Sequence, residues 1–377
     1  MEAVFEIIED NSANNISFNQ DYSIVSMGTQ RGYKIIQLAP IIYHEKNLSG
    51  SLERCEMSYK SNFLALVGGG KIPKYNNKKV VLYNDAENCI ETEYKFAMPV
   101  LNVKFKKNLI FIVCEKKIYV FNVQTSQNID SFDTITNKKG IIAVNGSPDK
   151  TIMAHPIEFE DAPDKGYVGI KNYKTNKYFP LLVDEEPPSN MEMDYYGLLL
   201  ATANDKGTIV RIHNLSDKTL IYECKRGKDK TFINYISFDL EYNYVGLTSN
   251  KGTIHIWKLD EIIDKEKKDD QIIYTVKKIN NYKTEFSFAK IKINKLNCIF
   301  CFKSKDRVLI ISPDEKCYIA NIDKKGGYLQ ASEKKDFSLL KEMKSEKKIK
   351  NSNNKKFLQF HQLIIQKSLK EINGAKN

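Results

Sequence analysis

Two adjacent cations followed by a glycine, Lys225, Arg226 and Gly227, are the residues of this chain best suited to bind an anion. Guanidinium and ammonium groups donate strong hydrogen bonds to phosphate and carboxylate oxygens. Neighbouring side chains of an extended strand point to opposite faces, so the two cations are expected to serve two ligands rather than one. Gly227 allows a sharp turn that brings backbone N–H groups close to whatever the cations hold.

The two cations lie between two copies of one repeated unit, residues 200–213 and 245–257. Each copy is an apolar run, a turn that ends in Lys-Gly-Thr, and an alternating run. The lysines of the two turns, Lys206 and Lys251, are 45 residues apart. This period is typical of a four-stranded propeller blade.

Short runs rich in β-branched and aromatic residues recur in seven units along the chain, which favours strands throughout. Stacked around an axis, such strands bury both faces and leave only short edges open. We predict an all-β fold, a single seven-bladed β-propeller over residues 1–332, followed by a basic, flexible tail over residues 333–377, for which a short helix is the alternative. The seven units are residues 16–37, 52–96, 100–121, 140–183, 191–225, 232–257 resuming at 286–291, and 298–330.

Composition narrows the class of protein. The chain has 377 residues, of which 42% are hydrophobic, and a net charge of +11, which favours an anionic partner. No stretch approaches the ~18 apolar residues of a membrane span. Acids without a basic region in the first ten residues argue against a signal peptide. We expect a soluble, cytoplasmic protein.

Other candidate chemistry is weak. Cys298 and Cys301 form the one Cys-x-x-Cys pair among seven cysteines, and no second pair completes a zinc site, so buried free thiols are favoured. The glycines at 68–70 lack the Gly-Lys-Ser/Thr ending of a phosphate loop. The five histidines are isolated from one another, and no Gly-x-Ser-x-Gly elbow occurs. We predict no enzymatic activity, no metal site and no cofactor.

The order and spacing of several segments resemble the PROPPIN family, seven-bladed propellers that bind phosphoinositides through a Phe/Leu-Arg-Arg-Gly motif between blades five and six. Here Cys224 replaces Phe or Leu and Lys225 replaces the first arginine, whereas Arg226 and Gly227 are retained. Lysine keeps the charge without bidentate geometry, so it is expected to grip phosphate more weakly. The other segments that carry the resemblance are residues 18–22, 28–35, 79–84 and 326–327.

This resemblance implies two phosphoinositide sites, one on each side of the motif. Asn204 stands where the family usually has serine, which weakens the first site. The residues alone allow a simpler interpretation, in which Ser or Thr after the Lys-Gly turn caps a hairpin and Arg211 pairs with an acid. The first site would contain Thr208, Arg211 and Lys225, and the second Arg226, Ser249, Thr253 and His255.

The resemblance also implies a function. We expect a monomer that binds membranes carrying phosphatidylinositol 3-phosphate or 3,5-bisphosphate and recruits effector proteins in autophagy or endolysosomal trafficking. Residues 260–283 correspond to a membrane-contacting loop and should project from the rim of blade six, with shallow, electrostatic attachment because their acids oppose an anionic leaflet. Nucleic acid is disfavoured, since the aromatic residues follow strand alternation rather than forming a stacking platform. The strongest alternative is a protein-interaction scaffold without lipid binding.

Overall fold

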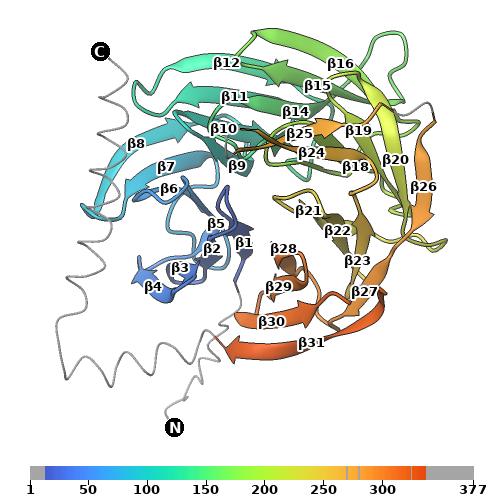
Figure 1. Cartoon of the computed structure of the whole chain (residues 1–377). Helices are drawn as coiled ribbons and strands as arrows, with labels where there is room; N and C mark the ends of the chain where they lie inside the picture. The colour runs from blue at the N-terminus through green and yellow to red at the C-terminus, as the bar shows by residue number, and fades with distance from the viewer. Residues whose placement is uncertain (1–12, 269–270, 279–280, 324, 337–377) are drawn as a thin grey trace.

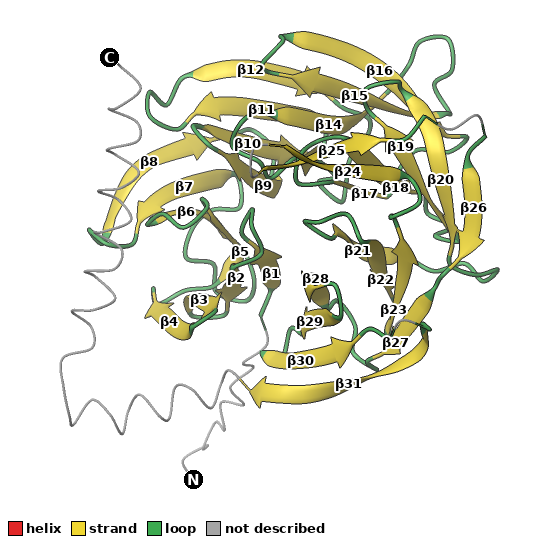
Figure 2. Ribbon diagram, in the orientation of Figure 1, coloured by secondary structure: helices red, strands yellow, loops and turns green. Residues whose placement is uncertain are grey.

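Strands alone make up the secondary structure of the described part of the chain, residues 13–268, 271–278, 281–323 and 325–336 of a computed structural model (Figure 2). They form seven antiparallel blades arranged in a ring (Figure 1). The predicted all-β, seven-bladed propeller is confirmed. Residues 337–377, which hold most of the predicted basic tail, lie outside the described residues.

Blades one to five each use four consecutive strands. They are β1 (Asn15–Phe18), β2 (Ile24–Thr29), β3 (Gly32–Leu38) and β4 (Ile41–Asn47); β5 (Leu52–Met57), β6 (Phe63–Gly68), β7 (Lys79–Asn84) and β8 (Cys89–Lys95); β9 (Val100–Lys106), β10 (Leu109–Cys114), β11 (Lys117–Asn122) and β12 (Asn128–Asp133); β13 (Ala143–Val144), β14 (Ile152–Ile157), β15 (Gly166–Asn172) and β16 (Lys177–Asp184); and β17 (Asn190–Met193), β18 (Leu199–Ala203), β19 (Ile209–Asn214) and β20 (Thr219–Lys225).

Blades six and seven are joined along their outer edges, because β31 pairs with β30 on one side and runs parallel to β27 on the other. Three further strands, β24, β25 and β26, interrupt blade six between its third and fourth strands. The strands of this region are β21 (Ile233–Phe238), β22 (Tyr244–Ser249), β23 (Thr253–Lys258), β24 (Ile263–Lys268), β25 (Gln271–Val276), β26 (Lys283–Phe286), β27 (Ala289–Lys292), β28 (Ile299–Ser304), β29 (Arg307–Ile311), β30 (Lys316–Asn321) and β31 (Gly327–Asp336).

The repeated Lys-Gly-Thr segment forms the turn between the second and third strands of blades five and six. Gly207 and Gly252 have φ values of 58° and 63°, which glycine adopts without the steric cost of a side chain. In each turn the glycine N–H donates to a carbonyl three residues earlier, that of Asn204 at 3.1 Å and that of Ser249 at 3.0 Å. The two copies of the repeated sequence therefore adopt the same turn geometry.

The core lies between neighbouring blades rather than within one layer. The second strand of a blade, such as β18 or β22, is buried along its whole length, which explains its continuous apolar sequence. Between blades five and six the large side chains Tyr222, Tyr242 and Trp257 are almost fully buried. Each fully buried apolar side chain stabilises the fold by roughly 1.5–3 kcal/mol. This packing fixes the positions of the two repeated turns relative to each other.

The ring closes by side-chain packing between blades one and seven. A hydrophobic cluster combines residues of β1 to β4 with residues of β28 to β30. Lys34 and Glu315 form a buried ion pair across the same boundary. The Ala13 N–H also donates to the Pro313 carbonyl at 3.0 Å. Blade seven is thus built from β28 to β31.

The excursion at residues 260–283 has its base packed on the propeller. Ile262 and Ile263 are buried, and the Tyr274 ring lies 4.8 Å from that of Tyr242 and 5.3 Å from that of Tyr196. The antiparallel strands β24 and β25 then carry an exposed outer part that includes Ile272. The base of the excursion is therefore packed against the propeller rather than projecting from it. None of the described residues forms a helix long and apolar enough to cross a membrane.

Candidate anion-binding site

The Lys-Arg-Gly segment leaves blade five at the end where the repeated turns lie. Lys225 is the last residue of β20 and pairs with Ile209 of β19. The Arg226 N–H then donates to the Thr208 carbonyl at 2.8 Å. The β18–β19 and β22–β23 turns occupy equivalent ends of their blades, so the predicted site residues of both blades lie at this end.

Arg226 is held firmly by backbone oxygens. Its Nε donates to the Gly207 carbonyl at 2.7 Å, and a terminal nitrogen donates to the Asp229 carbonyl. The residue is only 6% exposed, and this burial lowers the pKa of the guanidinium group, although the nearby Asp229 carboxylate raises it. The Arg226 side chain is therefore fixed in place and largely shielded from solvent. Arg226 orders the loop after β20 as well as carrying charge.

His255 lies near two positively charged groups, those of Arg226 and Lys290. Its Nδ1 lies 3.1 Å from the Ser287 hydroxyl, and its ring stacks on Trp257 at 6.0 Å between centroids. Burial, followed by the charges of Lys290 and Arg226, lowers the pKa of His255 to about 4. The imidazole is therefore neutral at pH 7, and the positive charge near it comes from Arg226 and Lys290.

The two hydroxyl residues of the second predicted site differ in their roles. Ser249 is 2% exposed, and its hydroxyl accepts from the Lys251 N–H at 3.4 Å, so it caps the turn. Thr253 is half-buried, and its hydroxyl has no hydrogen-bond partner among the described residues. The structure thus brings Arg226 and His255 together, leaves Thr253 available, and uses Ser249 locally.

On the blade-five side, Arg211 is already paired with acids. Its Nε donates to Glu223 at 3.1 Å, and a terminal nitrogen donates to Asp184. Asn204 also donates to Asp184, at 3.0 Å. Burial raises the pKa of the Asp184 carboxyl, whereas Arg211 lowers it. Arg211 therefore occupies the satisfied strand position that the simpler interpretation allowed.

Lys225 is the remaining cation of the first predicted site. It is half-buried, and its ammonium group has no ion-pair partner among the described residues. Thr208 is also half-buried, and the interaction it makes with the motif is through its carbonyl. Strand β26 runs beside β20 and places Phe286 opposite Lys225. The first predicted site is therefore a lysine next to a neutralised arginine.

Several residues that shape the site escaped the sequence analysis. Ser287 and Lys290 lie near His255 because β27 pairs with β23 after the excursion at residues 260–283. No local spacing in the sequence predicts that pairing. Glu223 stands opposite Arg211 across the β19–β20 pair, which strand alternation could have indicated once the hairpin was recognised. Asp184 comes from blade four, and nothing in the sequence links it to Arg211.

The cysteines fit the prediction of free thiols. Cys55, Cys89, Cys114, Cys224, Cys298 and Cys301 are free thiols, and all of these except Cys89 are buried. Cys317 is buried as well. Cys89 lies with Glu87 and Glu91 on the β7–β8 hairpin, where their ligand atoms are within 4.8 Å of one another. Both glutamates are exposed, as acidic turn residues commonly are without a metal.

Comparisons with known proteins place the chain in a family. A family model described as PROPPIN matches residues 12–276. Autophagy-related protein 18e of Arabidopsis thaliana is 28% identical over 344 residues, which cover 87% of this chain and 88% of that protein. Autophagy-related protein 18 of Komagataella pastoris is 27% identical over 283 residues, which cover 66% of this chain and 52% of that protein. This chain therefore spans about half the length of the Komagataella relative.

Solved structures show the same fold. Kluyveromyces lactis Hsv2 superposes with a TM-score of 0.68 at 17% identity, covering 86% of this chain and 98% of that one. KlAtg21, solved in a complex with the coiled-coil of AgAtg16, gives a TM-score of 0.68 at 18% identity with the same coverage. At these identities the likeness concerns the fold, whereas the family model matches well over half of the sequence. The chain belongs to the PROPPIN family.

Proposed function

We propose that this protein binds membranes carrying phosphatidylinositol 3-phosphate or 3,5-bisphosphate through the edge between blades five and six. The observation that carries this proposal is the meeting of Arg226 and Lys290 around the neutral His255, with Lys225 beside them and unpaired among the described residues. A phosphorylated head group needs such converging donors at an edge that solvent can reach.

The chemistry of the blade-six side suits a phosphate ester. The Arg226 guanidinium has five N–H donors, and its two carbonyl contacts fix its plane without cancelling its charge. Neutral His255 offers a further ring nitrogen, and Thr253 offers a hydroxyl. Lys290 contributes an ammonium group, which lies 5.5 Å from the centroid of the Tyr328 ring. Together they supply charge, direction and hydrogen bonds to one phosphate.

The two predicted sites are unequal in this proposal. The blade-six site, with Arg226, Ser249, Thr253 and His255, carries most of the binding. Ser249 contributes by shaping the turn that presents Thr253. The blade-five site, with Thr208, Arg211 and Lys225, is auxiliary, because Asp184 and Glu223 neutralise Arg211 and leave Lys225 as its effective cation.

The wider role we propose is an effector-recruiting scaffold, without enzymatic activity, in autophagy or endolysosomal trafficking. We place it in the cytoplasm and, peripherally, on endosomal, vacuolar or lysosomal, and autophagosomal membranes. The relatives named as autophagy-related proteins support the setting. The KlAtg21 complex with a coiled-coil supports recruitment of protein partners by a propeller of this family.

The test is liposome flotation at fixed salt across vesicles that differ only in their phosphoinositide. We expect flotation with phosphatidylinositol 3-phosphate or 3,5-bisphosphate and none with unphosphorylated phosphatidylinositol. High salt should weaken it, because exposed charges are screened within about 10 Å at 0.1 M ionic strength. Equal recovery with every vesicle, or with none, would reject lipid recognition and favour the scaffold without lipid binding.

A further inference from the structure

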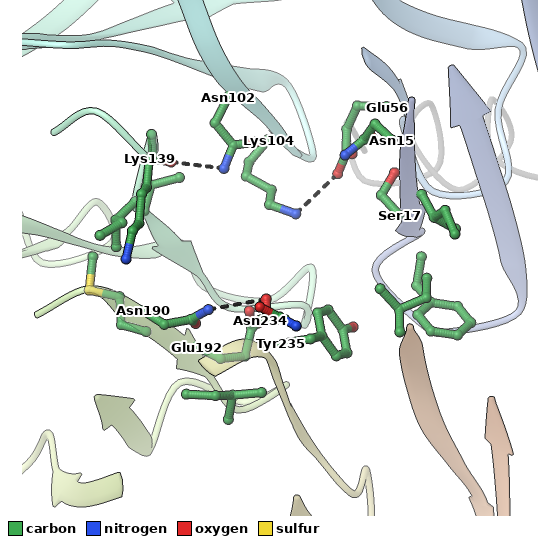
Figure 3. A pocket seen from close by; sticks show the side chains of 18 of the residues that line it. Asn15, Ser17, Glu56, Asn102, Lys104, Lys139, Asn190, Glu192, Asn234 and Tyr235 are labelled. Carbon is green, nitrogen blue, oxygen red and sulfur yellow. Dashed lines mark hydrogen bonds and ion pairs between the residues drawn. The ribbon is translucent and has the colours of Figure 1, made fainter. Parts of the chain in front are cut away.

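Two surfaces outside the proposed membrane edge carry several charged groups. A pocket of about 730 Å³ lies between the innermost strands of the blades, and its Lys104 ammonium group pairs with Glu56 at 3.4 Å (Figure 3). The outer surface of blade four carries acids that are not compensated in this way. Its outermost strand, β16, is also an open edge of its sheet. This outer surface is therefore the better candidate for a further contact.

An apolar stripe runs along one face of β16. Side chains alternate along a strand, so Tyr178, Pro180 and Leu182 share that face. All three are exposed, Tyr178 by 45% and Leu182 by 40%. The outermost strand of blade two differs, since it exposes the charged residues Glu91 and Lys95. Contiguous apolar surface of this kind marks sites of interaction.

Aromatic residues extend the stripe at both ends. Tyr167 of β15 stands opposite Leu182, and its ring stacks on that of Phe159 at 4.4 Å between centroids. At the other end, the Tyr178 ring stacks on that of Phe132, from blade three, at 5.6 Å. The blade-four stripe, as we call this surface, consists of Phe132, Phe159, Tyr167, Tyr178, Pro180 and Leu182.

The loop between β14 and β15 places four acids beside the Phe159 end of the stripe. Residues 158–164 contain these acids and no basic residue. All four are exposed, and none forms an ion pair with a described residue. A partner that covers the stripe should therefore combine apolar side chains with basic ones, because complementary charge gives specificity. The four acids are Glu158, Glu160, Asp161 and Asp164.

Residues 337–377 of the same chain have this composition. They contain ten lysines and three acids. The run from Phe357 to Ile365 holds six apolar residues, and the ten residues before it, 347–356, hold five lysines and no acid. A basic run next to an apolar run matches an acidic loop next to an apolar stripe.

The described residues bring this segment to the face that holds the acidic loop. Strand β31 ends at Asp336, which pairs with Lys316 beside the β29–β30 turn. The acidic loop is the equivalent turn of blade four, between its second and third strands. The stretch from Asp336 to Phe357 spans up to ~70 Å when extended. A globular domain of this size has a radius of gyration of roughly 20 Å, so the segment can reach blade four across that face.

We propose that residues 347–365 cover the blade-four stripe of their own chain. The apolar run 357–365 packs on the stripe, and the lysines of 347–356 face the four acids of the β14–β15 loop. Pro180 has no N–H to offer to a further strand, so side-chain packing rather than extension of the sheet holds the segment. This contact goes beyond the proposed function and is independent of lipid binding at the Arg226 edge.

Photo-cross-linking of the full chain, without lipid, tests the proposal. A p-benzoylphenylalanine in place of Tyr178 should cross-link to peptides from residues 347–365, and the product should keep the mass of one chain. The same group in place of Leu182 should do so as well, which keeps the test decisive if the first variant fails to fold. As a control position, Ile72 is 72% exposed between Lys71 and Lys74 and should give no such product.

Charge variants test the role of the acidic loop. Glu158→Gln combined with Glu160→Gln should lower the yield of the one-chain product several-fold, as expected for lost exposed ion pairs. Glu87→Gln combined with Glu91→Gln removes two exposed acids of blade two and should leave the yield unchanged.

Four results would overturn the proposal. They are the absence of cross-links to residues 337–377, an equal yield from the control position, a product with the mass of two chains, and equal yields from the two charge variants. Because no lipid is present, failure of liposome flotation alongside the expected cross-links would count against the proposed function alone.

Discussion

The two sides of the Lys225–Arg226 pair have the same repeated turn but opposite electrostatics. On the blade-five side, Arg211 meets the carboxylates of Asp184 and Glu223. On the blade-six side, Arg226 meets two backbone carbonyls, which orient a guanidinium group and leave its charge in place. A repeat therefore fixes where a cation stands, while the neighbouring strands decide whether its charge is available to a ligand.

Replacing Lys225 and Arg226 together with Thr should have the largest effect on this comparison. A hydrogen bond to a charged group contributes ~1.5–3 kcal/mol, so losing one at each site should cost about 3–6 kcal/mol, roughly a hundred-fold to ten-thousand-fold in affinity. Flotation with phosphatidylinositol 3-phosphate vesicles measures the loss. We also expect about 1–3 kcal/mol less stability in urea unfolding, because Arg226 satisfies two carbonyls.

A matched control separates this site from the general charge of the protein. Lys174 and Lys177 flank the β15–β16 turn at the opposite end of blade four and are exposed. Replacing both with Thr removes the same two charges and should leave flotation unchanged. Equal losses in the two double variants would mean that net charge, rather than the motif, attracts the membrane.

Arg211→Gln tests the blade-five side and should affect stability more than binding. Removing the cation leaves two largely buried carboxylates without compensation, and breaking a buried pair costs about 3 kcal/mol or more. Urea unfolding should show this loss, while flotation of the folded variant should stay within about threefold of the wild type. A stable Arg211→Gln protein that no longer floats would make Arg211 a ligand-binding residue.

Acid should destabilise the fold on the blade-five side and on the blade-six side alike, because each side contains a buried histidine. Burial lowers the pKa of His213 to about 4, and that of His255 to about 4. Since these values lie below about 6.5, the value for an unfolded chain, protonation favours unfolding. Their contribution is complete above pH 6.5 and is lost as the pH falls towards 4, by about 2 kcal/mol per histidine between pH 7 and pH 5.

Urea unfolding of the wild type and of His213→Gln at these two pH values measures that contribution. The difference between pH 7 and pH 5 should be about 2 kcal/mol smaller in the variant. An unchanged difference would mean that His213 titrates normally in the folded protein. Flotation should vary little between pH 8 and pH 6, because His255 stays neutral across that range.

The smallest effect we predict is that of Lys225→Arg. Arginine restores a fork that binds phosphate through two hydrogen bonds, so the auxiliary site should tighten by a few-fold. Quantitative flotation against lipid concentration can resolve such a change. Weaker binding would indicate that Phe286, which lies opposite Lys225, leaves no room for a guanidinium group.

The fold was largely predictable, because each blade repeats one local pattern of apolar runs separated by turns. The 45-residue echo between Lys206 and Lys251 is a direct consequence of two equivalent turns. The site was predictable only in part. Arg226 and His255 were identified from the motif and the repeat, and the structure brings them together.

The remaining features of the site depend on pairings that sequence distance hides. Asp184 reaches Arg211 from the neighbouring blade, and Lys290 reaches His255 only after the β24–β26 excursion. The burial of Arg226 could not be predicted from the sequence either, since an Arg-Gly segment after a strand resembles an exposed turn. Nothing in the motif indicates that Arg226 is only 6% exposed.

The number of head groups bound per chain tests the central claim most directly. Calorimetric titration of the wild-type protein with short-chain phosphatidylinositol 3-phosphate should give one site per chain in the accessible affinity range, because one side of the motif retains its arginine charge. The same titration of Arg211→Gln should give the same stoichiometry and affinity. Two sites of equal strength per chain, with one lost on replacing Arg211, would contradict the account.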